Sequence, residues 1–126
     1  MSENMNCPKP GEFSWNELVS NDVPLARKFY TSLFGWNAEA FAGGNDYTLF
    51  KQGDTMVGGL MQCPKPGLPS HWLPYVTVED VDATAAKAKK LGAQIAVEPF
   101  DVPTVGRIAV LVDPHGAAIG LFKPKM

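Results

Sequence analysis

Residues 21–35 read NDVPLARKFYTSLFG and residues 79–92 read EDVDATAAKAKKLG, and this shared pattern decides the fold of the chain. Each stretch opens with an acid, Asp22 or Asp80, which suits a helix start because a carboxylate there accepts hydrogen bonds from free backbone N–H groups. Each closes on a glycine, the residue that most often ends a helix. The pattern therefore predicts two amphipathic helices that begin directly after these acids.

The apolar residues of each predicted helix give its expected inner face. In the first helix, roughly residues 23–34, the inner face is expected to comprise Leu25, Ala26, Phe29 and Leu33. In the second helix, from residue 81 onward, it is expected to comprise Ala83, Ala86 and Leu91. Both helices should cover a sheet with these side chains.

The same order of landmarks continues on both sides of the two helices. A CPKPG segment precedes each helix, at residues 7–11 and 63–67. A similar apolar run containing Gly-Leu follows each one, at residues 57–61 and 118–122. Landmarks that recur in one order indicate an internal duplication.

The two copies, about residues 12–62 and 70–123, each contain one helix among four extended stretches. The expected strands are 13–19, 36–41, 46–51 and 55–62, then 72–78, 94–98, 107–112 and 117–122. Turn residues at 43–44, 52–54 and 113–116 should reverse the chain. The sequence thus predicts an α+β fold, in which two βαβββ repeats form a cupped mixed-sheet half-barrel with one ligand cleft between them.

Composition limits the classes of function. The 126 residues are enough for a single domain, residues 1–126, with 45% hydrophobic and 19% charged residues. A formal net charge of −2 gives no basic surface for nucleic acid. No run approaches the roughly 18 apolar residues of a membrane span. We expect a cytoplasmic protein that binds neither nucleic acid nor membrane. Cys7 and Cys63 fit reduced thiols of a cytosolic protein, and a disulfide between them is the alternative.

These motifs resemble the vicinal oxygen chelate superfamily, which includes glyoxalase I, extradiol dioxygenases and bleomycin-resistance proteins. The resemblance covers about residues 12–123 and rests on Asp22–Trp36, Val78–Ala83 and Asp113–Gly116. It implies the glyoxalase-like fold. It leaves the reaction open, because the superfamily hosts lyases, oxygenases and proteins that only bind.

The resemblance also implies four positions for metal ligands, at the starts of first strands and the ends of last strands. In this sequence they fall on Trp15, Gly59, Leu73 and Gly120. None of these residues carries the imidazole, carboxylate or thiolate that a divalent metal normally requires. If the second copy is aligned to the first with a shift of one residue, His71 falls near the start of its first strand and would be a single ligand. We therefore expect no metal and no other cofactor.

Glu17 is the candidate catalytic residue. Strand alternation places it on the same side as Trp15, facing the expected cleft. An apolar wall there would raise the pKa of its carboxyl, which could bind a ligand or act as a base. The alternative is a structural ion pair with Arg107. His115 is expected to be an exposed turn residue.

The expected ligand-binding residues are Trp15, Glu17, Met61, His71, Trp72, Tyr75 and Phe122. Their aromatic and thioether groups suit a flat ligand, although ordinary core packing explains them equally well. The expected function is binding of a small organic molecule without a metal. Two alternatives stay open: a metal-dependent lyase, isomerase or dioxygenase of the same superfamily, and a non-catalytic dimeric interaction module. A homodimer is an option because many members of the superfamily dimerise.

Overall fold

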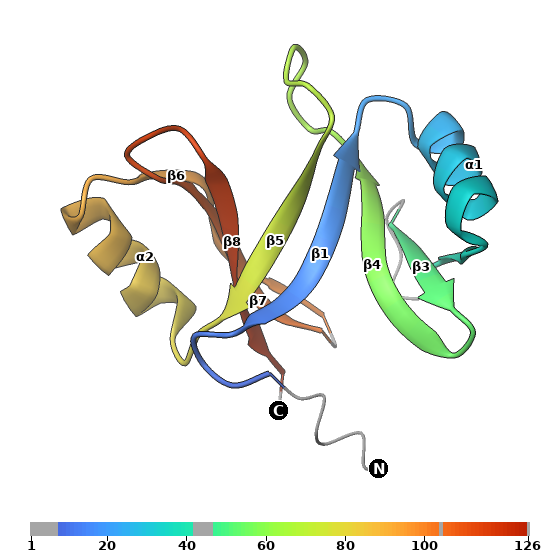
Figure 1. The fold of residues 1–126 in the computed structure, drawn as a ribbon. Coiled ribbons are helices and arrows are strands. Elements are labelled where there is room, and N and C mark those ends of the chain that lie inside the picture. The colour runs from blue at the N-terminus through green and yellow to red at the C-terminus, as the bar shows by residue number, and fades with distance from the viewer. Residues whose placement is uncertain (1–7, 42–46, 104, 126) are drawn as a thin grey trace. The chain divides into compact units, whose positions relative to one another are not determined.

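The computed structural model describes residues 8–41, 47–103 and 105–125, whose fold is shown in Figure 1. Within these ranges the chain forms two α-helices and eight β-strands. In chain order they are β1 (Phe13–Ser20), α1 (Val23–Phe34), β2 (Asn37–Ala40), β3 (Thr48–Gln52), β4 (Thr55–Gln62), β5 (His71–Thr77), α2 (Val81–Lys90), β6 (Gln94–Val102), β7 (Gly106–Val112) and β8 (Ala118–Pro124). This order is βαβββ twice, so the predicted duplication is confirmed.

The described chain divides into two compact units. The first unit is residues 15–73, with strand order β2-β3-β4-β1; β1 and β4 run parallel, and β3 is antiparallel to both of its neighbours. The second unit joins residues 8–14 to residues 74–125, with strand order β5-β8-β7-β6. Its β5 and β8 run parallel, and β7 is antiparallel to both neighbours. Each unit is a mixed sheet with one helix, which is the predicted α+β class.

Two hairpin turns use the residues that the sequence singled out. Between β3 and β4, Gly53 has φ = 60°, a left-handed conformation that glycine adopts without strain. Between β7 and β8, the Asp113 carboxylate accepts backbone hydrogen bonds from Ala117 (3.0 Å) and His115 (2.8 Å). These donors, Ala117 first, hold the pKa of Asp113 below its ordinary value. His115 is exposed, as predicted.

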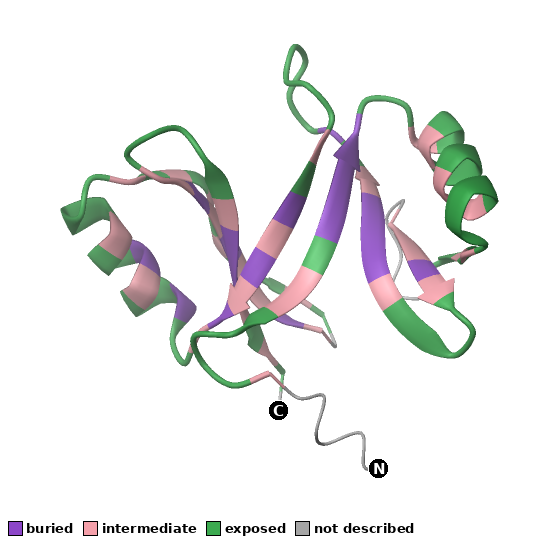
Figure 2. Cartoon of the chain, viewed as in Figure 1, coloured by how far each residue is buried: buried purple, intermediate pink, exposed green. Residues whose placement is uncertain are grey.

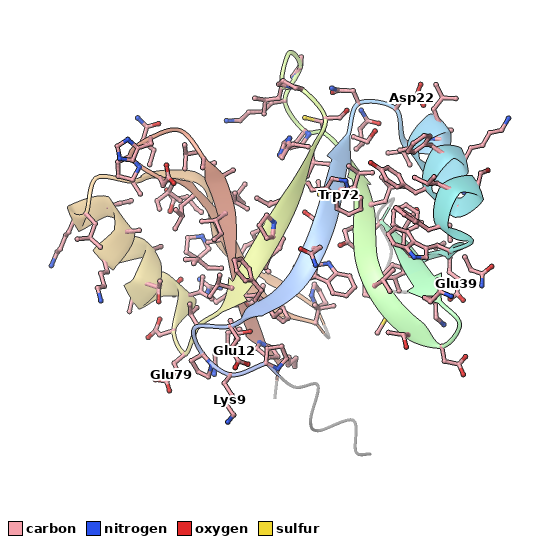
Figure 3. All side chains as sticks on the ribbon, in the orientation of Figure 1. Lys9, Glu12, Asp22, Glu39, Trp72 and Glu79 are labelled. Atoms are coloured by element: carbon pink, nitrogen blue, oxygen red, sulfur yellow. The ribbon has the colours of Figure 1, made fainter. Side chains whose placement is uncertain are left out.

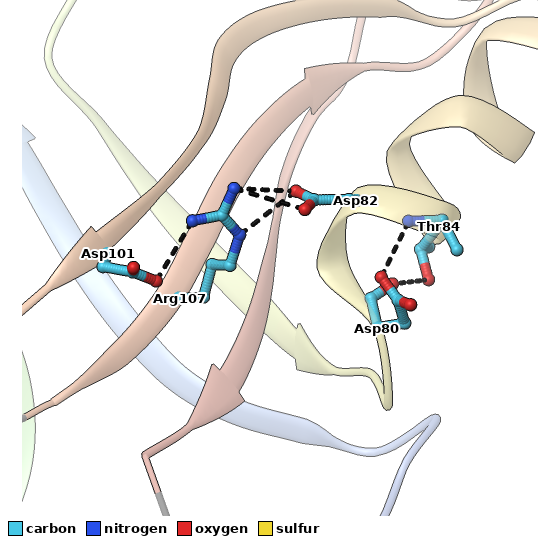
Figure 4. Close-up of polar contacts among 6 residues, drawn as sticks. Asp80, Asp82, Thr84, Asp101 and Arg107 are labelled. Atoms are coloured by element: carbon cyan, nitrogen blue, oxygen red, sulfur yellow. Dashed lines mark hydrogen bonds and ion pairs between the residues drawn. The ribbon is translucent and has the colours of Figure 1, made fainter.

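Acidic side chains begin both helices, as predicted. Asp22, labelled in Figure 3, accepts a hydrogen bond from the backbone N–H of Leu25 at 3.1 Å, and Gly35 ends α1 with φ = 74°. Asp80 caps α2 in the same way, accepting from the N–H of Ala83 at 2.9 Å. Its backbone carbonyl also accepts from the Thr84 hydroxyl at 2.8 Å (Figure 4). Local sequence thus defines where each helix starts.

The core of the first unit lies between α1 and its sheet. Phe50 and Leu60 are fully buried at its centre. The residues of α1 that pack against this core are Val23, Ala26 and Tyr30. The Tyr30 ring lies 6.1 Å from the Phe50 ring, centroid to centroid. One row of small and aromatic side chains therefore attaches α1 to the sheet.

The predicted inner face of α1 was correct for Ala26 and wrong for Leu25, Phe29 and Leu33, which are 64%, 57% and 56% exposed. The helix carries two apolar rows about one residue apart, and periodicity alone does not choose between them. The sheet takes the row in which Ala26 allows close approach and Tyr30 reaches the sheet aromatics. As Figure 2 shows, no residue of α1 is fully buried.

The predicted inner face of α2 was also wrong, because a different side of the helix faces the sheet. Val81 and Ala85 are buried against the core of the second unit, and Ala88 packs beside them. The expected residues Ala83, Ala86 and Leu91 are exposed. An alanine-rich helix gives little periodicity, so the branched side chain of Val81 decides which face is buried.

Arg107 lies between two acids on the surface of the second unit (Figure 4). Its guanidinium donates to Asp82 at 3.0 Å and to Asp101 at 3.1 Å. The carboxylates, Asp101 first, raise the pKa of Arg107 above its ordinary value. Exposed pairs of this kind add little stability. Arg107 thus has two partners of its own, neither of which is Glu17.

Two features of the described chain bear on the remaining expectations. Cys63 is buried and forms no disulfide with a described residue, whereas Cys7 and the predicted turn at residues 43–44 lie outside the described residues. The reduced state of both cysteines stays a prediction. Neither described helix has the length and apolar character needed to cross a bilayer.

Candidate functional site

Three side chains of the first unit form a hydrogen-bonded chain, which we call the Trp-Tyr-Glu relay. The indole Nε1–H of Trp15 donates to the hydroxyl of Tyr47 at 2.9 Å. That hydroxyl donates to Oε1 of Glu17, also at 2.9 Å. Trp15 is half-buried and Glu17 is 7% exposed. The relay therefore directs two donors in series toward a buried carboxylate, an arrangement that stabilises its negative charge.

The relay lies on the face of the sheet opposite α1. Leu18 belongs to the core under α1, and side chains alternate along a strand, so Trp15 and Glu17 point to the other face. On that face Glu17 of β1 lies beside Gly59 of β4. The Tyr47 side chain, from just before β3, reaches across β4 to meet Glu17.

Gly59 makes this crossing possible. A Cβ atom at Gly59 would overlap the hydroxyl oxygen of Tyr47 and lie 2.8 Å from its Cε2. Real Cβ atoms are not found so close to other side chains, so any residue larger than glycine would displace the Tyr47 ring. The Tyr47 hydroxyl occupies the space that a side chain at position 59 would fill.

The pKa of the Tyr47 hydroxyl is raised far above its ordinary value of 10.0. Burial is the largest cause, and the negative charge of Glu17 and the hydrogen bond donated to it act in the same direction. The Trp15 N–H opposes them by stabilising a phenolate. Tyr47 is thus held as a neutral donor to Glu17 at any ordinary pH.

A pH titration should therefore distinguish Tyr47 from an exposed tyrosine. Because the native pKa is raised, the unfolded chain releases the Tyr47 proton first, and the free energy of unfolding should fall by up to about 1.4 kcal/mol per pH unit above pH ~10. Below that pH Tyr47 should contribute no slope. Tyr47→Phe should remove this component in denaturant titrations from neutral to alkaline pH. An unchanged alkaline slope in the variant would contradict the assignment.

Three other predicted site residues belong to the first unit: Met61, His71 and Trp72. Met61 lies two residues beyond Gly59 on β4, beside Val19, so its half-buried side chain shares the face of the relay. His71 is half-buried at the start of β5, and its Nδ1 lies 2.8 Å from the backbone carbonyl of Pro69. That contact is made within its own segment of chain.

Trp72, labelled in Figure 3, packs against α1, whereas the relay lies on the opposite face of the first unit's sheet. Its indole packs edge-on against Tyr30 of α1, with 5.3 Å between ring centroids, and its Nε1–H donates to the Tyr30 hydroxyl at 3.2 Å. The structure therefore places Trp72 with the aromatic residues under α1. It does not bring Trp72 together with Trp15 and Glu17.

Tyr75 and Phe122 lie in the second unit. Tyr75 is 3% exposed, and its register partner on β8 is Gly120, just as the partner of Glu17 on β4 is Gly59. A Cβ at Gly120 would overlap the Tyr75 ring. Phe122 follows on the same face of β8 and is half-buried. Tyr75 is therefore the repeat counterpart of Glu17, and it too lies over a glycine.

The residues at the four expected ligand positions do not fit a divalent metal. Trp15 and Leu73 offer no oxygen, sulfur or imidazole donor, and the space over Gly59 and Gly120 is filled by tyrosine rings. Across the described ranges, no three or more His, Cys, Asp or Glu side chains are grouped so that they could hold a metal ion.

Sequence reasoning missed Tyr47. Its signal was available in the alternation of β3, since Phe50 faces α1 and residues an odd number of positions away face the other side. A second signal was the Gly58-Gly59 pair, because glycine inside a strand often marks a close approach by another group. Neither signal alone identifies Tyr47 as the partner of Glu17.

The sequence matches the family model of the Glyoxalase/Bleomycin resistance protein/Dioxygenase superfamily over residues 13–121. It is 47% identical over 116 residues to "Putative glyoxylase CFP32" of Mycobacterium tuberculosis (strain CDC 1551 / Oshkosh), covering 90% of this chain and 44% of that protein. It is 32% identical over 130 residues to the anthracycline biosynthesis protein DnrV of Streptomyces peucetius, covering 90% and 47%. The chain thus spans less than half the length of these curated relatives.

Solved structures share the fold. The Mn(II)-bound glyoxalase from Novosphingobium aromaticivorans matches with a TM-score of 0.62 at 18% identity, over 91% of this chain and 39% of that one. Methylmalonyl-CoA epimerase from Mycobacterium tuberculosis matches with a TM-score of 0.61 at 16% identity, over 91% and 89%. These similarities confirm the glyoxalase-like α+β fold predicted from the sequence.

Proposed function

The chain belongs to the glyoxalase/bleomycin resistance protein/dioxygenase superfamily, and from this premise we propose that it binds a small organic molecule at the Trp-Tyr-Glu relay without a metal ion. The observation that carries the proposal is the position of the Tyr47 hydroxyl. It lies over Gly59, where the superfamily pattern would place a metal ligand, and it donates to the buried carboxylate of Glu17.

The relay has the chemistry of a small-molecule site. The Glu17 carboxylate is held in an orientation fixed by Tyr47, and a ligand hydroxyl or amine can donate to it. Trp15 is only half-buried, so part of its indole is available to stack on a flat ring. Met61 adds an adaptable apolar group on the same face. An apolar surface with a few fixed polar groups is typical of sites for organic ligands.

The name of one relative narrows the ligand class. The relative from Streptomyces peucetius is named for anthracycline biosynthesis, which directs attention to flat, hydroxylated aromatic molecules. Such molecules combine the ring that Trp15 can stack on with the hydroxyl that Glu17 can accept from. We propose this class for the present chain.

Tryptophan fluorescence provides the test, with catechols, hydroxyanthraquinones and anthracycline aglycones as probes. Binding beside the relay should quench the emission of Trp15. The variant Trp15→Phe should lose the saturable quenching, whereas Trp72→Phe should keep it, because Trp72 lies on the face that packs against α1. Trp72→Phe is a matched control, since both variants leave two tryptophans in the chain.

Two results would contradict the proposal. Saturable quenching that survives Trp15→Phe would place the ligand elsewhere. Stoichiometric manganese, zinc, nickel or iron in the purified protein, together with glyoxalase or dioxygenase activity that depends on it, would favour the metal-dependent alternative.

A further inference from the structure

An apolar row runs along the outer side of α1. Leu25, Phe29 and Leu33 follow one another at intervals of four residues, which places them on one side of the helix. They are 64%, 57% and 56% exposed. We call these three residues the α1 row. With Lys28 and Ser32 they line an open hollow on the first unit.

The βαβββ unit does not require this row. The core under α1 is made by the other apolar row of the helix, which includes Ala26 and Tyr30. In the second unit, counting from the capping acid puts alanine and lysine, Ala83 and Lys87, at the positions of Leu25 and Phe29. The third position is an exposed leucine in both units, Leu33 and Leu91, so the units differ at the positions of Leu25 and Phe29. A contiguous exposed apolar patch on one unit marks a surface that another molecule covers.

The size of the patch bears on what covers it. The α1 row and the neighbouring Phe34, which is 52% exposed, offer on the order of 400 Å² of apolar surface. A standard interface buries about 800 Å² on each partner, somewhat more than half of it apolar. The patch therefore matches the apolar part of one half of a dimer interface.

We propose that two copies of this chain associate through the α1 row, with the two α1 helices packed antiparallel about a twofold axis. In such an arrangement one patch covers an identical patch, so a single surface suffices for both copies. With the axis at Phe29, that ring meets the partner's Phe29, and Leu25 meets the partner's Leu33. Residues spaced by four form the ridges that interdigitate when helices pack. This inference does not depend on the ligand proposed for the relay.

Charge helps to decide whether a second copy of the chain or an anionic membrane covers the α1 row. Helix α1 contains Arg27 and Lys28 and no acidic residue, so an anionic membrane is a competing occupant. The net charge of the chain is −2, however, which opposes binding to an anionic surface. Bringing the two Lys28 side chains near each other costs less than about tenfold in affinity at an exposed site. Each buried leucine or phenylalanine contributes about ten- to a hundredfold, so self-association prevails.

The test is the oligomeric state in solution, measured by sedimentation equilibrium over a wide range of concentration. The wild-type chain should show a reversible dimer. Phe29→Glu and Phe29→Lys should each raise the dimer dissociation constant at least 100-fold, and mixing the two variants should restore a heterodimer because the opposite charges meet at the axis. Phe100→Glu is the matched control: Phe100 is 45% exposed on the second unit, so this variant should dimerise like the wild type.

Three outcomes would overturn the proposal. The first is a wild-type chain that stays monomeric at all concentrations, and the second is a dimer insensitive to both Phe29 variants. The third is a monomer that sediments with phosphatidylserine vesicles in a manner lost in Phe29→Glu, which would assign the row to a membrane. Circular dichroism melting of each variant serves as the control for folding. Because the substituted positions are exposed, the variants should remain folded, and a change in sedimenting mass then reports association.

Discussion

Gly59→Ala is expected to lower the free energy of unfolding by about 3 kcal/mol, at the upper end of the usual cost of overpacking. The added Cβ would overlap the hydroxyl of Tyr47 and part of its ring. The ring would have to leave Glu17, so the variant should lose the hydrogen bond to a buried carboxylate as well as good packing. Urea unfolding of the variant and wild type measures the difference.

A double-mutant cycle attributes this cost to Tyr47. In a Tyr47→Ala background the ring is gone, so adding Gly59→Ala should cost much less than it does in the wild type. Residues in contact show coupling of about 0.5–3 kcal/mol, whereas independent sites add to within about 0.5 kcal/mol. Additive effects would show that the glycine is needed for some reason other than the tyrosine.

Glu17→Gln is expected to weaken binding of a hydroxylated aromatic ligand by about 10- to 100-fold, the effect of losing one hydrogen bond to a charged group. The amide keeps the shape of the side chain and can still accept from Tyr47, so the variant removes the negative charge and leaves the relay in place. Fluorescence titration with the compound that binds the wild type most tightly gives the two dissociation constants.

Glu39→Gln is the matched control for this loss of charge. Glu39, labelled in Figure 3, is exposed on β2, where it pairs with Lys51 at 3.3 Å. Its replacement should leave ligand binding unchanged. Equal affinities for all three proteins would mean that Glu17 does not contact the ligand, even if the quenching of Trp15 persists. That result would separate the role of the carboxylate from the location of the site.

The fold was predictable because its signals are local and occur twice. Asp22 and Asp80 cap their helices as the sequence indicated, and the turn at residues 113–116 has the expected chemistry. The alternation of β1 also placed Trp15 and Glu17 on one face correctly. Each of these inferences depends only on residues close together in the chain.

The remaining features depend on contacts between distant residues. The sequence of α1 offers two apolar rows, and only the aromatic residues of the sheet show that Tyr30 belongs to the inner one. Trp72 was expected to line the same ligand site as Trp15, but its contact with Tyr30 places it on the other face. The partnership of Tyr47 with Glu17 needs the order of three strands and a glycine between them, which a single sequence does not show.

The close fit of Tyr47 over Gly59 also constrains the order in which substitutions at these two positions can be accepted. A lineage that once carried a larger side chain at position 59 could take up the tyrosine only after that side chain had been reduced. The reverse route meets the same barrier, since any enlargement at position 59 is harmful while Tyr47 remains. Two substitutions in a fixed order are then needed to restore a ligand there, and the first brings no benefit. While Tyr47 is present, position 59 is accordingly closed to any side chain that could bind a metal.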